Sequence, residues 1–148
     1  MDIRVLLPHD KDAVLALART FHDRAIDDPM ERELQSWTAP WRAEALDHYL
    51  KLGWSYGAFS GAELKGFLLA QPILFFRGLT QTLWVESLLS ESAQTSQELL
   101  DTVHRWARDK HFQCVWVEGE KELRAQASSF KQAINKNVDY VELRSSRY

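Results

Sequence analysis

The 148-residue sequence has one cysteine, no excess of basic residues and no long apolar run. Because Cys114 is alone, a disulfide framework and a cysteine-rich zinc site are excluded, and a reducing compartment is favoured. The 18 Lys and Arg against 21 Asp and Glu give a formal net charge of −3, which argues against a dedicated nucleic-acid binder and a polybasic membrane-surface domain. No stretch approaches the roughly 18 uncharged apolar residues of a membrane helix. A cytoplasmic protein is therefore expected.

Several kinds of site also lack their motifs. The five histidines show no His-x-x-x-His spacing, so no metal site is expected. There is no Gly-x-Ser-x-Gly elbow of a serine hydrolase, no phosphate-binding P-loop and no dinucleotide fingerprint. The composition, 45% hydrophobic and 26% charged, is that of a globular protein. Without repeats or linkers, one domain over residues 1–148 is expected, and a homodimer is left open.

The N-terminal part of the sequence predicts one strand and two helices. Ile3 to Leu7 is a short apolar run, and Asp10 is placed to cap a helix with apolar residues at helical spacing. The acidic, proline-containing segment Asp27 to Pro40 is expected to be irregular. A second helix is predicted from Arg42 to Leu52, followed by a glycine that ends it.

The centre of the chain predicts a meander of three strands. These are Trp54 to Phe59, Leu64 to Leu74 and Thr82 to Leu89, because β-rich runs are separated here by glycine-containing turns. A polar loop, Ser90 to Thr95, is expected to follow the third strand.

The C-terminal third predicts alternating helices and strands. A helical apolar stripe runs from Leu99 to Ala107, and Phe112 to Val117 is a near-continuous apolar strand. A last helix is predicted from Leu123 through Ile134, and Val138 to Leu143 is predicted to close the chain as a strand.

This order of elements predicts an α+β fold (α/β by a looser label). Tight turns in the meander imply antiparallel pairing, whereas a crossover helix requires strands 82–89 and 112–117 to be parallel. The expected architecture is a mixed, mainly antiparallel central sheet with helices on both faces.

Four segments carry a resemblance to a known family. They are IRVLLPHDKDAVLALA, GAELKGFLLAQP with a glycine after a charged residue, LWVESLLS with an acid before two leucines, and ELLDTVHRWARDKHFQCVWVEG. In this order they resemble the GNAT superfamily of acetyl-CoA-dependent N-acetyltransferases, and LWVESLLS is similar to its polyamine-type branch. The resemblance implies a GNAT-like fold, acetyl-CoA as acyl donor and an amine, small-molecule or protein, as acceptor.

The resemblance also implies a degenerate CoA loop. In the family, a loop of the form Arg/Gln-x-x-Gly-x-Gly/Ala wraps the pyrophosphate of CoA at a helix N-terminus. The corresponding stretch here, Ser90 to Gln97, has no Gly, Arg or Lys. Thr95 and Glu98 fit a capping box, which predicts a carboxylate where the pyrophosphate would lie. In the last helix, Ile134 stands where the family often has a proton-donating tyrosine.

The cofactor positions implied by the resemblance follow the third meander strand. Backbone amides near Leu88, Leu89 and Ser90 are expected to hold the acyl oxygen. The implied cofactor-binding residues further along are Gln94, Thr95, Ser96 and Gln97.

Glu86 is the candidate catalytic residue. In the family, an acidic residue near this place takes a proton from the amine, directly or through water, and such a base must lie within hydrogen-bond reach. The alternative is a salt-bridged or solvent-facing glutamate on a sheet.

In the family, the region between the first two helices borders the acceptor site, so the resemblance implies a candidate acceptor site in this segment. Asp28 and Glu31, with Trp37 and Trp41, suit a cationic amine through Coulomb and cation–π attraction. The alternative is that the tryptophans pack the second helix onto the sheet.

Two functions are consistent with these observations. The first is an acyltransferase that moves an acyl group from CoA to an amine. The second is a non-catalytic binding or regulatory module that keeps the fold but has lost CoA binding, since a fold does not by itself fix a function. The glycine-free stretch favours the second, and the Glu86 strand favours the first.

Overall fold

The computed structural model describes residues 1–118, 121–131, 133–134, 136 and 141–145. Its sheet has five strands that lie side by side in chain order. The strands are β1 (Asp2–Val5), β2 (Tyr56–Ser60), β3 (Glu63–Phe76), β4 (Leu79–Ser90) and β5 (Cys114–Val117). The first three pairs are antiparallel and β4 pairs with β5 in parallel. The predicted parallel alignment of strands 82–89 and 112–117 is therefore confirmed.

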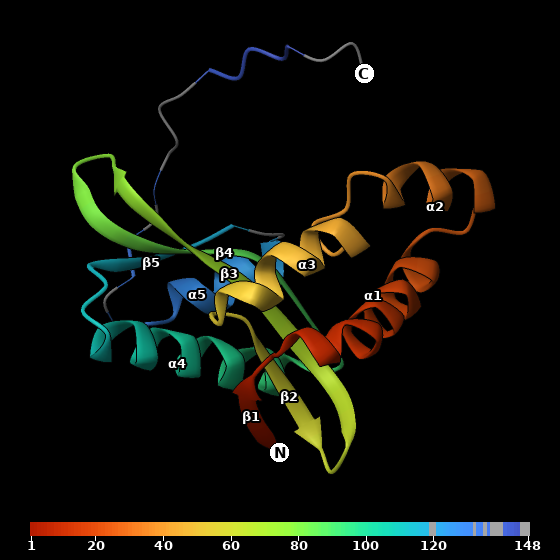
Figure 1. The fold of residues 1–148 in the computed structure, drawn as a ribbon, viewed down its shortest axis with the longest axis horizontal. Coiled ribbons are helices and arrows are strands. Elements are labelled where there is room, and N and C mark those ends of the chain that lie inside the picture. The colour runs from red at the N-terminus through yellow and green to blue at the C-terminus, as the bar shows by residue number, and fades with distance from the viewer. Residues whose placement is uncertain (119–120, 132, 135, 137–140, 146–148) are drawn as a thin grey trace.

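Helices cover both faces of this sheet, as the α+β prediction requires (Figure 1). The helices are η1, a 3-10 turn (Pro8–Asp10), α1 (Lys11–Ala25), α2 (Pro29–Ser36), α3 (Ala43–Leu52), α4 (Ala93–Asp109) and α5 (Lys121–Ser128). Helices α1 and α3 pack on one face, and α4 and α5 pack on the other. Gly53, at a left-handed φ of 78°, ends α3 as predicted.

The alternation of side chains along β3 divides the core in two. Phe67 and Leu69 are fully buried against α1 and α3, whereas Leu68 and Ala70 are fully buried against α4. Successive residues of a strand point to opposite faces, so an uninterrupted apolar run is what a strand covered on both sides needs.

Two predictions near the N-terminus are wrong. The segment Asp27 to Pro40 is not irregular throughout, because Pro29–Ser36 forms α2. Asp28 is its N-cap and accepts a hydrogen bond from Met30 N at 3.2 Å. Asp10 makes no side-chain cap on α1. Its carboxylate instead binds both terminal nitrogens of Arg4 at 2.9 Å and the Leu7 amide at 2.8 Å.

The C-terminal predictions are met only in part. Helix α5 ends at Ser128, so the predicted extension to Ile134 is wrong, and the Ile134 side chain is 75% exposed. Of the predicted last strand, positions 138–140 lie outside the described residues. Val141 and Leu143 are described, exposed and not part of a strand.

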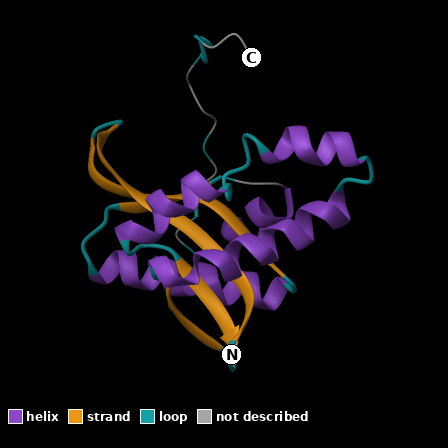
Figure 2. Ribbon diagram, turned by 45° about the vertical axis from the view of Figure 1, so that its right-hand side comes forward, coloured by secondary structure: helices purple, strands orange, loops and turns teal. Residues whose placement is uncertain are grey.

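The β3–β4 hairpin is long and twisted, and its tip extends beyond the helices (Figure 2). Phe75, Arg77 and Gly78 take positive φ at this tip. None of the described helices is long and apolar enough to cross a membrane.

Candidate functional site

Strand β4 contains an extra residue at Glu86. In the pairing of β3 with β4, Glu86 lies between Val85 and Ser87, which both have partners on β3, and has no partner itself. A β-bulge of this kind bends a strand and turns the side chain of its extra residue. The parallel pairing of β4 with β5 ends at the same point, with Val85 opposite Val117. Strand β5 ends at Val117, and Glu118 N still donates to Val85 O at 3.3 Å. Strand β4 continues to Ser90, so its residues from Glu86 onward lie beyond the end of β5.

Two aromatic residues lie beside the half-buried Glu86. Trp84 Nε1 donates a hydrogen bond to Glu86 Oε2. Tyr49 lies on the buried stripe of α3 with Leu46 and Leu50. Burial, and secondarily the charge of Glu86, raises the pKa of Tyr49 to about 12.

Gln71 joins the tyrosine to a histidine. Gln71 Nε2 lies 3.4 Å from the Tyr49 hydroxyl, and Gln71 Oε1 lies 2.8 Å from His48 Nε2. Across the ladder, Gln71 is the register partner of Trp84. A carboxylate, a phenol, an amide and an imidazole are thus gathered from α3, β3 and β4. We call these residues, Glu86, Trp84, Tyr49, Gln71 and His48, the Glu86 cluster.

The Glu86 cluster holds one group that can accept a proton and one that keeps its proton. A carboxylate within hydrogen-bond reach of an ammonium can act as a general base. The phenol of Tyr49, like any tyrosine, is protonated at neutral pH and can donate a hydrogen bond, and its raised pKa of about 12 keeps the proton in place at alkaline pH. The cluster can therefore accept a proton and donate a hydrogen bond at neutral pH.

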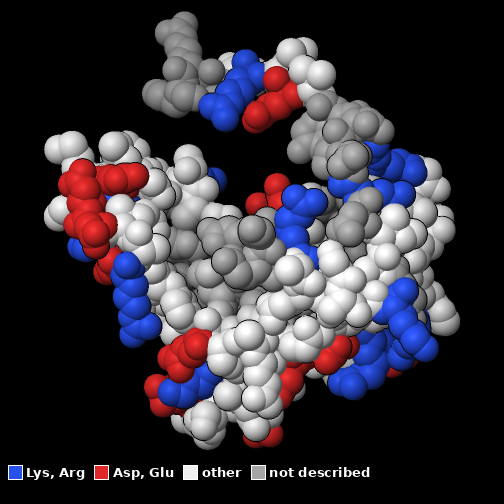
Figure 3. All heavy atoms as spheres, turned by 180° about the vertical axis from the view of Figure 1, so that it is seen from behind, with Lys and Arg blue, Asp and Glu red and all other residues white. Residues whose placement is uncertain are grey.

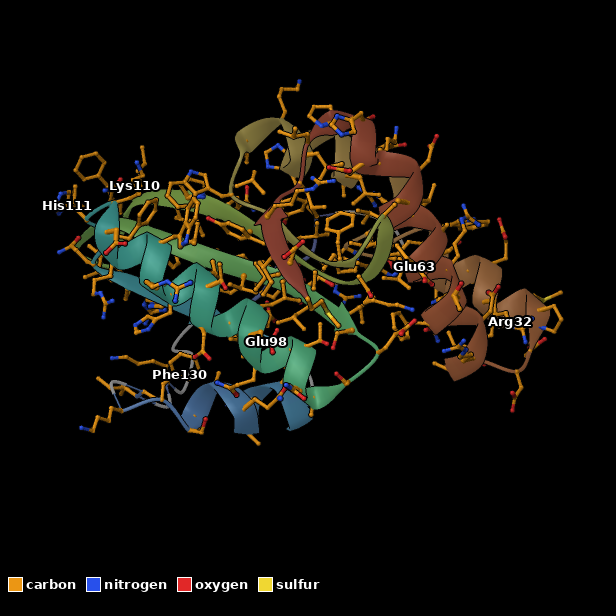
Figure 4. The ribbon with its side chains drawn as sticks, turned by 90° about the horizontal axis from the view of Figure 1, so that it is seen from below. Arg32, Glu63, Glu98, Lys110, His111 and Phe130 are labelled. Carbon is orange, nitrogen blue, oxygen red and sulfur yellow. The ribbon has the colours of Figure 1, made fainter. Side chains whose placement is uncertain are left out.

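The β4–α4 turn differs from the prediction. Ser92, not Thr95, is the N-cap of α4, and Ser92 Oγ accepts from Thr95 N at 3.1 Å. The helix begins three residues earlier than predicted, and its first turn holds no acidic residue. Glu98 lies further along α4 (Figure 4), where its carboxylate accepts from Gln94 Nε2 at 3.4 Å. The capping box of Thr95 and Glu98 predicted a carboxylate at the start of this helix. That prediction is wrong, because the first turn of α4 holds none.

The hydroxyl side chains of the turn form hydrogen bonds within it. Ser90 Oγ lies 2.6 Å from both Ser92 O and Ser96 Oγ, and Ser92 Oγ lies 2.9 Å from Thr95 Oγ1. These hydroxyls close the short turn on itself.

A lysine that the sequence analysis did not single out lies next to this turn. Lys65 Nζ is 3.0 Å from Glu63 and 3.7 Å from Glu91, and Glu91 N donates to Lys65 O at 3.2 Å. The hydrogen bond that the Lys65 ammonium donates to Glu63 is the main reason that the pKa of Lys65 is raised. The first turn of α4 holds no acid, which suits an anionic group such as a phosphate at this helix N-terminus. The charge of the Lys65 ammonium, in contrast, is already balanced by the two glutamates.

The cofactor-binding residues implied by the resemblance lie in two places, the end of β4 and the start of α4. Leu88 packs toward α4 and Leu89 toward α1 and α3, while their backbones pair with β3. In α4, Thr95 and Ser96 are buried. The longer side chains bond along the helix, Gln94 to Glu98 and Gln97 to Asp101.

The implied acceptor residues lie at the α2 end of the molecule. Seen from behind, the acidic side chains of this end form a group (Figure 3), and Arg32 of α2 lies at the opposite end from Lys110 and His111 (Figure 4). The described side-chain hydrogen bonds of Asp28, Glu31 and Trp37 join them to residues 30, 35 and 33 of α2. The contacts therefore do not bring these three residues to Glu86.

Trp41 is separate from the other acceptor candidates. It is 6% exposed and packs edge-to-face on His22, with ring centroids 5.1 Å apart. Both residues line a cavity of about 190 Å³ between α1 and α2, with Arg19, Arg32 and Glu33. Trp41 and His22 therefore pack the α1–α2 junction and also line this cavity.

Solved structures with the same fold include acetyltransferases. The protein TTHA1254 from Thermus thermophilus matches with a TM-score of 0.70 and 23% identity over 99% of this chain and 100% of that chain. A predicted acetyltransferase from Clostridium acetobutylicum, solved with acetyl-CoA, matches with a TM-score of 0.68 and 12% identity over 97% and 95%. The polyamine N-acetyltransferase of Drosophila melanogaster, which forms N-acetylagmatine, matches with a TM-score of 0.64 and 14% identity over 84% and 78%.

These likenesses establish the class of fold, which is that of the GNAT acetyltransferases, and confirm the resemblance seen in the sequence. Within that class, the chain belongs to the family described as "Protein of unknown function (DUF1999)", whose model matches residues 1–147. No curated protein matches the sequence.

Proposed function

We propose that this protein is an acyltransferase that moves an acyl group from the thioester of acyl-CoA to an amine, with Glu86 as the base. The observation that carries the proposal is the position of Glu86, half-buried in the bulge of β4, next to the last residue that pairs with β5, and bound by Trp84. The fold supports acyl transfer, because acetyltransferases share it.

In this proposal Glu86 prepares the acceptor. It takes one proton from the ammonium group, and the freed nitrogen lone pair then attacks the thioester carbonyl that acyl-CoA supplies. Starting from the ammonium, two N–H bonds and the C–S bond are broken, and one C–N and one S–H bond are formed. One of the two protons ends on the CoA thiol, and the other passes from Glu86 to solvent. Tyr49, which keeps its proton up to a pH of about 12, is the residue proposed to donate a hydrogen bond in the site.

The end of β4 is the proposed place for the acyl oxygen. In an antiparallel ladder only alternate N–H groups point to the partner strand. Because pairing with β5 stops at Val85, the amides between Glu86 and Ser90 that point away from β3 have no partner on β5. Such amides can stabilise a developing oxyanion. For the phosphates, Lys65 and the first amides of α4 are the proposed contacts.

A second candidate function, a binding module without CoA chemistry, is favoured by the β4–α4 turn. Its hydroxyl groups bond within the turn at 2.6–2.9 Å, to one another and to the Ser92 carbonyl, and Ser92 Oγ also accepts from the Thr95 amide. The stretch from Ser90 to Gln97 holds no glycine. A turn of this kind offers fewer free backbone amides than a glycine-rich phosphate loop.

The two functions are separated by measuring thiol release from millimolar acetyl-CoA with a panel of primary amines. We expect turnover that falls about 100-fold in Glu86→Gln, the usual scale for loss of a general base. Glu44→Gln, which removes an exposed acid from the start of α3, is the matched control and should keep parental turnover. An absence of turnover in the parent protein, together with no stabilisation by acetyl-CoA, would favour the binding module.

A further inference from the structure

Three aromatic side chains form a continuous row on the sheet next to Glu86. Trp84 on β4 and Trp116 on β5 are register partners, and their ring centroids lie 6.3 Å apart. Phe76, near the tip of the β3–β4 hairpin, lies 5.4 Å from Trp116. Both contacts are edge-to-face, the geometry that aromatic rings favour. We call Phe76, Trp116 and Trp84 the aromatic row.

The aromatic row lies on the face of the sheet that α3 covers. Leu83 and Val85, the neighbours of Trp84, are buried against α4, so Trp84 points to the opposite face. Tyr49 and Gln71 reach that same face from α3 and β3. The hairpin that bears the outer end of the row extends past α3 (Figure 2).

The row ends at a carboxylate, and its three rings are only partly buried. Trp84 Nε1 binds Glu86 directly, Trp84 and Trp116 are half-buried, and Phe76 is 40% exposed. Among the described contacts of the three rings, the one with a carboxylate is the hydrogen bond that Trp84 donates to Glu86. The row therefore pairs one negative charge with an extended apolar surface.

We propose that the aromatic row and Glu86 form the acceptor subsite for a primary amine that carries an aromatic group, such as an arylalkylamine. This inference rests on the proposed function and names its acceptor class. The ammonium is matched in charge to Glu86, while the ring of the ligand packs on Trp116 and Phe76 and removes apolar surface from water. A diamine of similar length places its second ammonium over those rings, where an exposed cation–π contact is worth less than burial of an aromatic ring.

The subsite is tested by isothermal titration calorimetry without acetyl-CoA, so that binding is read apart from catalysis. The probes are 2-phenylethylamine, ethylamine and 1,4-diaminobutane. We expect 2-phenylethylamine to bind at least tenfold more tightly than either of the others. Trp116→Leu and Phe76→Leu should each remove most of that preference, and Glu86→Gln should weaken binding of all three amines.

Matched controls lie outside the row. Trp106→Leu changes a tryptophan of α4 that is 43% exposed and contacts Tyr56, and Phe75→Leu changes a ring that is 82% exposed at the hairpin tip. Both should keep the preference for 2-phenylethylamine. If Trp116→Leu fails to fold, Phe76→Leu still tests the row, because Phe76 is partly exposed.

The outcomes separate this inference from the proposed function. Equal binding of 2-phenylethylamine and ethylamine, or a preference unchanged in both row variants, overturns the inference. Acylation of amines without preference for the aromatic one also overturns it while leaving the acyltransferase proposal in place. Row-dependent binding with no acylation of any amine supports the subsite and refutes the acyltransferase.

Discussion

Replacing Gly66 by alanine is expected to disturb the place where β3 meets the end of β4. A Cβ at position 66 would lie 2.7 Å from Ser90 Cβ and 3.2 Å from both Leu89 O and Ser90 Cα. Two of these three atoms belong to the backbone, so rotation of a side chain cannot relieve the contact. Overpacking of this kind costs about 1–3 kcal/mol, which lowers the melting temperature of a chain of this size by roughly 2–12 °C.

The assay is thermal unfolding followed by circular dichroism, on a double-mutant cycle of Gly66→Ala and Ser90→Gly. Ser90→Gly removes the atom nearest to the new Cβ, so the double variant should be more stable than the sum of the single effects predicts, by about 0.5 kcal/mol or more. Gly61→Ala is the comparison. Its Cβ would meet nothing within 4 Å, and its cost comes from a φ of +61°, so it should show no coupling to Ser90→Gly.

Two results would refute this reasoning. One is a Gly66→Ala variant whose stability lies within about 0.5 kcal/mol of the parent, which is the scale of a neutral surface change. The other is strict additivity of the Gly66 and Ser90 effects. If the expected coupling is found, it gives a physical reason for the glycine after Lys65 in the hairpin segment that resembles the GNAT family, because the end of β4 fills the space of a side chain.

Three further predictions concern charge, pH and ligand. The pKa of Asp10 is lowered chiefly by its hydrogen bonds with Arg4, so its stabilising effect is present above its unfolded pKa of about 3.9 and is lost as the pH falls through the folded value. Acid titration of stability should therefore be less steep in Asp10→Asn, which is expected to cost about 1–3 kcal/mol at neutral pH. Burial raises the pKa of Tyr49 and of Tyr56 to about 12, so stability should fall as the pH rises from about 10 through about 12. Each Tyr→Phe variant should lose one late step in the absorbance titration of tyrosinate, and a step that ends near pH 10 would contradict the burial. Acetyl-CoA is expected to bind weakly, so melting temperature should shift little at sub-millimolar ligand, whereas ligand at 100 times its dissociation constant would add about 2.7 kcal/mol. A clear shift at micromolar acetyl-CoA would contradict this, and a shift lost in Lys65→Ala would assign the phosphate contact.

The predictions from the sequence succeeded where a pattern is repeated along the chain. The apolar runs of β3 and β4 and the stripe of α4 recur over many residues, so their period could be recognised without knowledge of their neighbours. The parallel pairing of β4 with β5 followed from the crossover helix between them.

The errors arose where one residue has two competing roles. Asp10 was expected to cap a helix, but Arg4 lies within reach and binds its carboxylate through two hydrogen bonds. Proline was taken to interrupt the segment after α1, although Pro29 occupies the first turn of α2, where its missing N–H costs nothing and its φ suits a helix. At the start of α4, Ser92 and Thr95 are both acceptable caps, and only the tertiary structure buries Thr95.

The candidate site could be predicted only as far as Glu86. Its neighbours Tyr49 and Gln71 come from other elements, and Tyr49 looked like an ordinary member of the apolar stripe of α3. Spacing along a chain carries no information on which helix crosses which strand, so this association required the structure.

The bulge at Glu86 also shows how little the sheet itself depends on that residue. Deletion of Glu86 would bring Val85 and Ser87 together, and their partners on β3, Ala70 and Leu69, are already consecutive. The shortened strand would therefore alternate regularly, with every remaining side chain on its present face and every remaining pair in its present register. The hydrophobic pattern of the strand is therefore the same whether Glu86 is present or absent. Related sequences that differ by one residue at this point are expected to keep the architecture, and to differ in what the strand presents to a ligand.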